Sequence, residues 1–384
     1  MHDPERWWHR FHYEDWVASE GLELIRGHQV DNVFTVRLRY WPRTEGYAVH
    51  IQLDGSGERA AAYVQEIPPT KKLNPQRHLY EELIYVLTGR GSTSVWYDED
   101  KKRTFEWGSG SLFAIPLNAY HQHFNVSGTE SARYLALTTA PTMMNFIRND
   151  DFIFDNPFRF TDRFDQEQDY FNAEVKSRVY ERIPGVSGAG NAYFANLWPD
   201  INTVFERPRD ETRKFNPETD RNISEGRAGY QFELADGVLG AHIWEAPGGT
   251  FTSVHRHGPA SHVLWLKGEG YSILWPDGGE HTKQKEDWGP GTLIVPPLWW
   301  WHGHNVTSLE SARYIALKMS SRKNMVTRAH EFTTVSTRLD PRGQQISFAD
   351  LTPETLADLK RIFLDECAKK GTPVDPRMQQ VIGG

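Results

Sequence analysis

The sequence carries the residues ESARYLAL at positions 130–137 and nearly the same residues, ESARYIAL, at positions 310–317. Two shorter blocks recur in the same order: LTGRG at 87–91 as LKGEG at 266–270, and WGSG at 107–110 as WGPG at 288–291. Each block lies about 180 positions from its copy, a spacing too long for the unit of a solenoid. The repeat therefore indicates a duplicated domain.

Within each copy, apolar residues fall in short runs of the kind that form β-strands. Residues 83–87 (LIYVL) and 92–97 (STSVWY) are rich in β-branched and aromatic side chains and lie between turn-forming residues. Many short strands separated by turns predict an antiparallel sandwich or barrel. Helical patterns occur only at the periphery, at residues 13–20 and from about residue 353 to residue 370.

These patterns divide the chain into four expected parts. They are an N-terminal region with a first barrel at 1–140, a connector at 141–235, a second barrel at 236–325, and a C-terminal extension with a helix at 326–384. A chain of 384 residues is also too long for one ordinary hydrophobic core. We therefore predict an all-β protein with two tandem sandwich or barrel domains and a few peripheral helices.

The composition narrows the classes of partner. A formal net charge of −8 argues against a nucleic-acid-binding surface, which needs a concentrated basic face. No apolar run reaches the length of a membrane span, and residues 1–11 do not resemble a signal peptide. The single cysteine, Cys367, excludes an intrachain disulfide and a cysteine-rich zinc site. We expect a cytoplasmic protein without nucleic-acid or membrane partners, and a homo-oligomer because barrel edge strands often pair between subunits.

Residues 76–82 (QRHLYEE) carry metal-ligating side chains at alternating positions. Side chains two residues apart in a strand share a face, so Gln76, His78 and Glu82 can point into one cavity. A second segment places His121 just after a proline turn, where a neighbouring strand would start. The two segments resemble the two motifs of the cupin superfamily: a His-x-His strand followed by a Glu and a Gly, and then a Gly-Pro-His-Asn segment.

The resemblance implies tandem jelly-roll barrels of the cupin type with a metal site in the first. Its ligands would be His78, Glu82 and His121, with Gln76 at the position of the first histidine of the family. An amide oxygen is a poorer ligand than imidazole for a late transition metal, but the other three residues suit ferrous iron with open positions. The alternative is a barrel that has lost its metal and has a structural role.

The second copy reads HRHGPASH at 255–262 and PPLWWWHGHN at 296–305. The same resemblance implies three histidine ligands: His255, His257 and His302. The repeat places Ser261 at the position of Glu82, so the carboxylate is absent. Three neutral imidazoles leave the full charge of a divalent cation, which favours an anionic, chelating substrate. Zinc also accepts three histidines. The alternative is a metal-free barrel whose histidines form hydrogen bonds in its interior.

This second copy is similar to the gentisate and 1-hydroxy-2-naphthoate dioxygenase branch of the bicupins, although that branch usually carries its working site in the N-terminal barrel. The resemblance implies a non-haem Fe(II) dioxygenase. Its substrates would be dioxygen and a small hydroxylated, aromatic carboxylic acid that chelates the metal. Mn(II), Ni(II) or Zn(II) are alternative ions. The alternative functions are a metal-dependent lyase, isomerase or decarboxylase working through an enolate, and a non-enzymatic ligand-binding bicupin.

Three further residues are candidates beside the second metal. Trp301 is the last of three consecutive tryptophans, and alternation along the segment would send at least one of them into the cavity. His304 shares a strand face with His302 and is a candidate proton donor. Ser261 can make room for the substrate. The alternatives are core packing for Trp301 and a hydrogen bond inside the core for His304.

Overall fold

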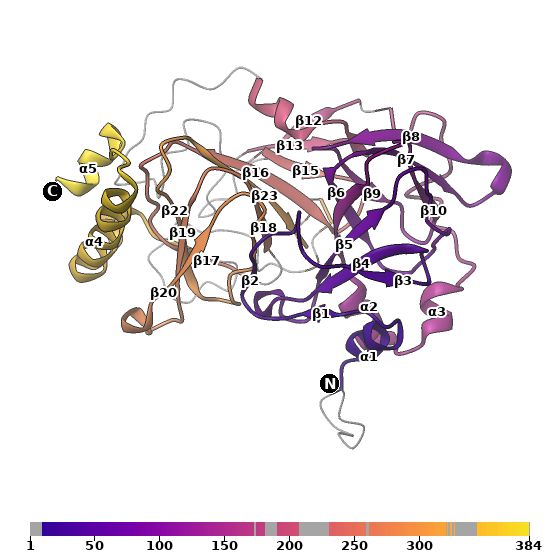
Figure 1. Ribbon diagram of the computed structural model, residues 1–384, viewed down its shortest axis with the longest axis horizontal. Coiled ribbons are helices and arrows are strands. Elements are labelled where there is room, and N and C mark those ends of the chain that lie inside the picture. Colours follow the sequence, from indigo (N-terminus) through magenta and orange to yellow (C-terminus); the bar gives the residue numbers. More distant parts are fainter. Residues whose placement is uncertain are drawn as a thin grey trace.

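The structure, a computed structural model, describes residues 10–172, 174–180, 190–206, 230–258, 261–319, 321, 323–324, 326 and 344–383. These residues form two β-barrels side by side, with helices at the outer ends (Figure 1). The predicted fold class, all-β with two tandem jelly-roll barrels and a few peripheral helices, is confirmed. The helices are α1 (His12–Ser19), α2 (Ala140–Ile147), α3 (Asp150–Phe154), α4 (Pro353–Lys370) and α5 (Gln379–Ile382).

The first barrel consists of two sheets. The larger has the strand order β1-β4-β5-β11-β6-β9-β14, with β3 paired to β4, and the smaller has the order β10-β7-β8. The strands are β1 (Leu24–Ile25), β3 (Arg39–Trp41), β4 (Gly46–Ile51), β5 (Ala61–Ile67), β6 (Glu82–Thr88), β7 (Arg90–Trp96), β8 (Arg103–Gly108), β9 (Leu112–Ile115), β10 (Tyr120–Asn125), β11 (Ala132–Thr138) and β14 (Leu197–Trp198).

The second barrel repeats this arrangement. Its larger sheet has the order β12-β13-β15-β16-β23-β18-β21-β2, and its smaller sheet has the order β20-β19-β22-β17-β24. The strands are β2 (Gln29–Val30), β12 (Lys176–Tyr180), β13 (Gly190–Phe194), β15 (Tyr230–Glu233), β16 (Gly240–Ala246), β17 (His255–Arg256), β18 (Ser261–Lys267), β19 (Gly270–Trp275), β20 (Gln284–Trp288), β21 (Leu293–Ile294), β22 (Trp301–Val306), β23 (Ala312–Lys318) and β24 (Gln344–Gln345).

The longest repeated block forms the central strand of each larger sheet. Strand β11 lies between β5 and β6, and β23 lies between β16 and β18. Two guanidinium nitrogens of Arg133 donate to Glu66 on the neighbouring strand, and Arg313 donates to Glu245 in the same way. The repeat therefore preserves both the pairing of the strands and an ion pair between them.

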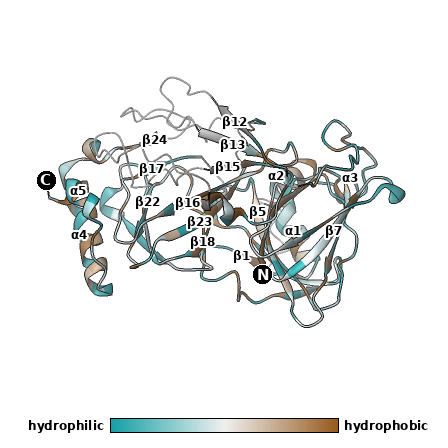
Figure 2. Cartoon of the chain, turned by 90° about the horizontal axis from the view of Figure 1, so that it is seen from above, coloured by the Kyte–Doolittle hydropathy of each residue, from teal (hydrophilic) through white to brown (hydrophobic). Residues whose placement is uncertain are grey.

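The two larger sheets pack against each other through one face and line their own barrels with the other. On β11, Leu135 and Leu137 belong to a hydrophobic core shared by both barrels, as do Ile315 and Leu317 on β23. The alternate residues, Tyr134 and Ala136 or Tyr314 and Ala316, lie in the separate core of each barrel. Strands buried on both faces read as nearly continuous apolar runs. Figure 2 shows much of this central region in the hydrophobic colour.

The barrels exchange short strands. Strand β2, from the N-terminal region, pairs with β21 of the second barrel, and β14, from the connector, pairs with β9 of the first. Residues 181–189 and 207–229 of the predicted connector lie outside the described residues. In the part that is described, the connector supplies helices and strands that pack on both barrels.

Helix α4 begins and ends where its sequence signals predict. The hydroxyl of Thr352 accepts a hydrogen bond from the backbone of Thr355, and Gly371 ends the helix in the left-handed conformation. The buried face of α4 covers the outside of the smaller sheet of the second barrel, next to Trp275 and Trp301. Figure 1 shows α4 and α5 beside this barrel. In the described part of the chain, no helix has the length and apolar character of a membrane span.

A glycine turn that belongs to the repeat offers a test of the fold. Gly268 has a φ of +75°, and a Cβ added there would lie 2.7 Å from the Cα of Ala312. We expect Gly268→Ala to lower the free energy of unfolding by roughly 3 kcal/mol, through backbone strain and steric clash together. Gly278 has a similar φ of +71° but open space around it, so Gly278→Ala should cost about 1 kcal/mol. Urea denaturation measures both, and equal losses would contradict the clash.

Candidate metal centres

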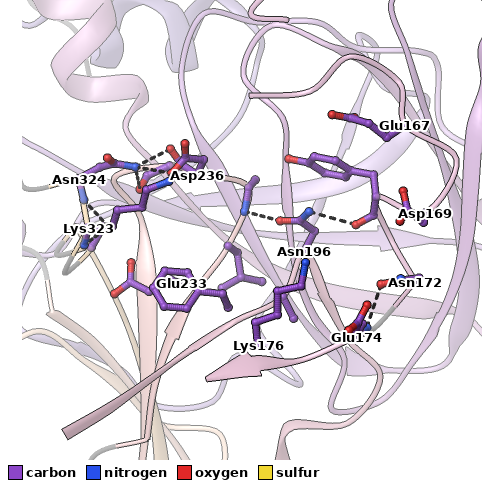
Figure 3. A pocket seen from close by; sticks show the side chains of 17 residues that line it. Glu167, Asp169, Asn172, Glu174, Lys176, Asn196, Glu233, Asp236, Lys323 and Asn324 are labelled. Atoms are coloured by element: carbon purple, nitrogen blue, oxygen red, sulfur yellow. Dashed lines mark hydrogen bonds and ion pairs between the residues drawn. The ribbon is translucent and has the colours of Figure 1, made fainter. Parts of the chain in front are cut away.

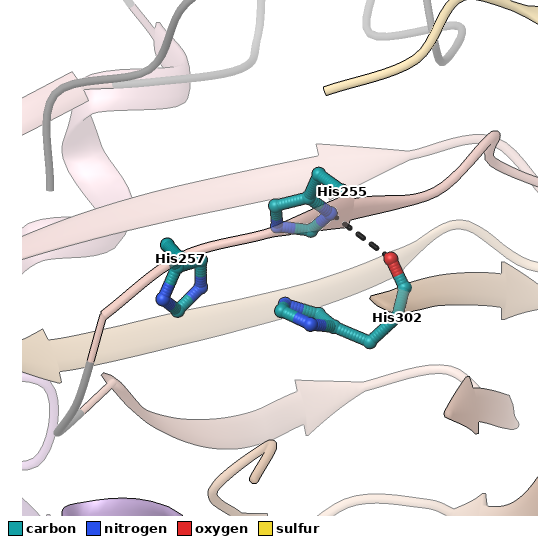
Figure 4. A group of neighbouring side chains, drawn as sticks. All are labelled: His255, His257 and His302. Carbon is teal, nitrogen blue, oxygen red and sulfur yellow. Dashed lines mark hydrogen bonds between the residues drawn. The ribbon is translucent and has the colours of Figure 1, made fainter. Parts of the chain in front are cut away.

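Three histidines meet at one end of the second barrel. His255 lies on β17, His257 follows directly after that strand, and His302 lies on β22, opposite His255. One ring nitrogen from each lies within 4.8 Å of the other two (Figure 4). The structure thus brings together the three side chains that the sequence predicts as the second ligand set.

Backbone carbonyls determine which ring nitrogen of each histidine is available. Nδ1 of His255 donates to the carbonyl of His302 at 3.1 Å. Nδ1 of His257 donates to that of Gly258 at 2.8 Å, and Nδ1 of His302 donates to that of Trp300 at 2.9 Å. A carbonyl oxygen can only accept, so each Nδ1 carries a proton, and in a neutral ring the lone pair is then on Nε2. Metal-binding histidines usually donate their second ring N–H to such a partner. The three residues therefore fit a divalent cation, of which three protein ligands would leave further coordination positions unfilled.

A second group lies in the first barrel. His78 lies in the segment before β6, Glu82 is the first residue of β6, and His121 lies on β10, with their ligand atoms within 4.8 Å of one another. Nδ1 of His78 donates to the carbonyl of Tyr80 at 2.9 Å, and Nδ1 of His121 donates to that of Ala119 at 3.3 Å. The two Nε2 atoms lie 3.0 and 3.7 Å from Oε2 of Glu82. This set also fits a divalent cation.

The charges of the first group suit a cation. Burial alone would raise the pKa of Glu82, but hydrogen bonding and charge from His78, together with His121 and a hydrogen bond from Tyr63, hold it at about 2. Burial lowers the pKa of His121 to about 3. At neutral pH the group therefore offers an ionised carboxylate and a neutral imidazole, the protonation states in which these side chains bind metals.

Two tyrosines enclose the first group. The ring of Tyr80 stacks on His78 with centroids 3.7 Å apart, and the hydroxyl of Tyr63 donates to Glu82. Both tyrosines are buried, as are all three candidate ligands. A cation held here would have little access to a substrate, so the first site is built as a closed one.

The strand register shows where the second site differs from the first. Ser261 lies opposite Lys318, as Glu82 lies opposite Thr138, so Ser261 occupies the position of the carboxylate as the repeat predicts. His242 lies opposite Ala316, in the position that Tyr63 takes in the first barrel. Whereas Tyr63 is buried, His242 is partly exposed. The three histidines of the second group are nevertheless buried, as are the ligands of the first.

Two predicted site residues make contacts away from the candidate ligand atoms. Gln76 lies opposite His121, in the register of His255, but its amide nitrogen donates to the backbone carbonyls of residues 43, 74 and 75, so it is not placed as a ligand. Trp301 faces away from the barrel interior, because neighbouring residues on a strand point to opposite faces and His302 points inward. Its indole donates to Asp277 and its ring packs with α4, outside the cavity.

The side chain of His304 lies inside the second barrel, one layer deeper than the three histidines. Its ring centroid is 5.8 Å from that of His302, and Nδ1 lies 2.8 Å from the hydroxyl of Ser272. The first barrel has the same arrangement, with Nδ1 of His123 2.8 Å from the hydroxyl of Thr93. Burial lowers the pKa of His123 to about 4.

Sequence reasoning missed His123, although a spacing signal was present. His123 follows His121 by two residues, as His304 follows His302. It also missed Tyr63 and Tyr80, for which the sequence carries no comparable signal, because their roles depend on which strands become neighbours.

Two residues that the sequence sets aside have structural roles. Arg256 points outward, forms an ion pair with Asp277 at 3.0 Å and packs over the ring of Trp301. Cys367 is buried on α4, where burial raises the pKa of its thiol to about 11, so it is a packing residue and not a nucleophile.

A separate cavity of about 320 Å³ lies between the connector and the second barrel (Figure 3). None of the candidate ligands lines it. Among the described residues, the lining ones include Glu167, Asp169, Asn172, Lys176, Asn196, Glu233, Asp236, Lys323 and Asn324. The side chain of Asn196 connects two parts of the lining, donating to the carbonyl of Tyr170 and accepting from the backbone of Ala235. We assign no chemistry to this cavity.

No protein-family model and no curated protein matches the chain. Among solved structures, it is similar to the oxalate decarboxylase of Bacillus subtilis, a protein with Mn(II) centres, at 12 % identity and a TM-score of 0.45 over 78 % of this chain and 79 % of that one. For an oxalate decarboxylase of Lactobacillus farciminis in a formate complex, the values are 11 % and 0.46 over 76 % and 86 %. A further oxalate decarboxylase gives 11 % and 0.48 over 91 % and 88 %. Identities this low do not identify a reaction.

Proposed function

We propose that the second barrel is the catalytic one and binds a single divalent cation on His255, His257 and His302. The fixed orientation of the three rings carries the proposal, because each Nδ1 donates to a backbone carbonyl and leaves Nε2 for the cation. A cation held there would act as a Lewis acid that withdraws charge from a carboxylate or enolate oxygen. Fe(II), Mn(II), Ni(II) and Zn(II) all accept imidazole ligands.

We propose further that the substrate is a small carboxylic acid and that the reaction is a non-oxidative one, a decarboxylation or another lyase reaction through an enolate. Three neutral ligands leave the cation's charge uncompensated, whereas the first barrel supplies Glu82. A reaction that ends by protonating an enolate carbon needs a proton donor. His304, with Nδ1 held by Ser272, is the candidate. The group in the first barrel, which Tyr63 and Tyr80 enclose, would then hold a structural cation.

A dioxygenase is the second candidate. The all-histidine ligand set supports it, and so do the aromatic rings of Trp265 and Tyr314, whose centroids lie 5.6 and 5.7 Å from that of His304. An aromatic wall suits a planar substrate. Dioxygen would be a substrate of this reaction and not of the first.

Metal analysis and anaerobic turnover test the proposal together. We expect elemental analysis of freshly purified protein to find two divalent cations per chain, one for each group of ligands. Metal-loaded protein, kept anaerobic, should then convert a member of a panel of dicarboxylic, 2-oxo and phenolic acids. Turnover that requires and consumes dioxygen would select the dioxygenase instead. Protein that binds no cation at the second barrel would refute both candidates.

A further inference from the structure

In each barrel a tight turn leads into the strand that carries one of the candidate ligands. Residues 116–119 form this turn before β10, and residues 297–300 form it before β22. The backbone N–H of the fourth residue donates to the carbonyl of the first, at 3.1 and 3.0 Å. The third residue has a positive φ in both turns, +59° at Asn118 and +62° at Trp299. The two copies therefore share a backbone conformation at a position where their residues differ.

The two residues suit this conformation very differently. A positive φ at the third position of a turn is one that glycine and asparagine adopt readily. Asn118 fits this preference, and its amide nitrogen also donates to the carbonyls of Asn156 and Phe158. For a bulky residue such as Trp299, a positive φ is an outlier that strains the backbone.

Core packing does not offset the strain at Trp299. Its side chain is partly exposed and belongs to none of the hydrophobic core clusters that the described residues form. A strained conformation persists only where the surrounding structure determines it, and such positions gather at ligand-binding sites. The contacts of the backbone at Trp299 are therefore the ones to consider.

These backbone contacts lead to two of the three histidines. The N–H of Trp299 donates to the carbonyl of His257 at 3.2 Å. The carbonyl of the next residue, Trp300, accepts from Nδ1 of His302 at 2.9 Å. Rotation about φ of Trp299 would turn its N–H relative to the carbonyl that follows, so both hydrogen bonds depend on this one angle.

The first barrel shows the same relation between turn and ligand. The carbonyl of Ala119, which follows Asn118, accepts from Nδ1 of His121 at 3.3 Å. The side chains of Asn118 and Trp299 have little in common, whereas their φ angles and the hydrogen bond to the following histidine ring are alike. What the two sites share at this position is therefore the backbone.

We propose that Trp299 is a positioning residue of the second metal centre, and that its left-handed backbone conformation holds His257 and His302 in the arrangement that binds the cation. The residue acts through its main chain, so another residue that adopts a positive φ would serve in its place. This inference rests on the proposed function of the second barrel.

Calorimetric titration of the full chain with Mn(II) tests the inference. Trp299→Val introduces a β-branched residue, for which a positive φ is a severe outlier. It should weaken one of the two expected cations by about 10–100-fold, as the loss of a contact that orients a ligand does. Trp299→Gly and Trp299→Asn remove the indole but accept the positive φ, so both should bind two cations with wild-type affinity.

The electron paramagnetic resonance spectrum of bound Mn(II) gives a second readout, because it depends on how the ligands are arranged. It should change in Trp299→Val and keep its wild-type form in Trp299→Gly and Trp299→Asn. A general loss of stability would not be reversed by residues as different as glycine and asparagine. Recovery in both therefore distinguishes positioning by the backbone from packing of the indole.

Leu298→Val is the matched control, because it places the same β-branched residue one position earlier in the turn, where φ is not positive. It should leave the affinity for both cations unchanged. If Trp299→Val fails to fold, Trp299→Ala takes its place, with an expected weakening of the same cation that is smaller but measurable. Wild-type affinity in the alanine variant would contradict the inference.

The outcomes separate the inference from the proposed function. Wild-type protein that binds no cation at the second barrel would refute the proposed function, and the inference with it. Wild-type protein that binds two cations, with unchanged affinity in Trp299→Val, would overturn the inference alone. A loss in Trp299→Gly and Trp299→Asn equal to that in Trp299→Val would also overturn it, since the indole would then be responsible.

Discussion

Replacing His257 with alanine is expected to lower turnover by more than about 100-fold, because it removes a metal ligand itself. Loss of a residue that only orients a ligand through a hydrogen bond has a smaller effect, of about 10- to 100-fold. The same change should reduce bound metal from two cations per chain to one. Nδ1 of each of the three histidines donates a hydrogen bond to a backbone carbonyl. Neither remaining histidine can therefore rotate to replace the nitrogen lost with His257 without breaking its own hydrogen bond. Elemental analysis and turnover of the same sample measure both effects.

The matched control for this variant is His281→Ala. His281 is exposed in the turn between β19 and β20 and belongs to neither candidate group. It should leave metal content and turnover at the wild-type values. If His257→Ala keeps its turnover while His78→Ala abolishes it, the first barrel is the catalytic one and the assignment of the barrels is wrong.

Replacing His78 with alanine is expected to destabilise the metal-free protein by about 3–5 kcal/mol. Glu82 is buried, and His78 is the largest favourable influence on its charge. Removing one partner of a buried pair leaves the other charge in a site of low polarity without compensation. Urea denaturation at neutral pH, followed by tryptophan fluorescence, measures the loss.

A double variant shows whether this buried charge is the cause. In His78→Ala with Glu82→Gln, the carboxylate is replaced by a neutral amide of the same size, so much of the lost stability should return. If the double variant is less stable than His78→Ala alone, the loss comes from packing against Tyr80 and not from the charge of Glu82. Turnover in the second barrel should change little in either variant.

The duplication was predictable because local backbone geometry restricts which residues its turns accept. The glycines at 89 and 268 both have positive φ, where an added Cβ would meet the first residue of β11 or β23, so the turn tolerates little change. The two histidine groups were predictable for a similar reason, since strand alternation and a recognisable motif place their members. Both signals are contained within short segments of sequence.

Strand alternation explains the position of Trp301. Within β22, Trp301 and His302 are neighbours and must face opposite sides, whereas Trp299, with a φ of +62°, lies before the regular strand. The backbone of Gln76 keeps the register of a ligand, while its amide nitrogen reaches nearby carbonyls. The contacts of that amide are not visible in a list of residue types.

The two copies differ directly after the longest repeated block, with Thr138 in the first copy and Lys318 in the second. Differences between copies at matched positions show where duplicated barrels have diverged. That Lys318 lies opposite Ser261 follows only from the pairing of β23 with β18.

The exchange of β2 and β14 has a consequence for how the chain matures. Gln29 pairs with Ile294, so a strand made early in synthesis waits for a partner that leaves the ribosome much later. In the first half, the edge strand β9 waits for β14, and open edges are where newly made chains associate wrongly. Each half therefore completes a sheet with a strand from outside its own repeat, and we expect neither half expressed alone to reach the stability of the whole chain.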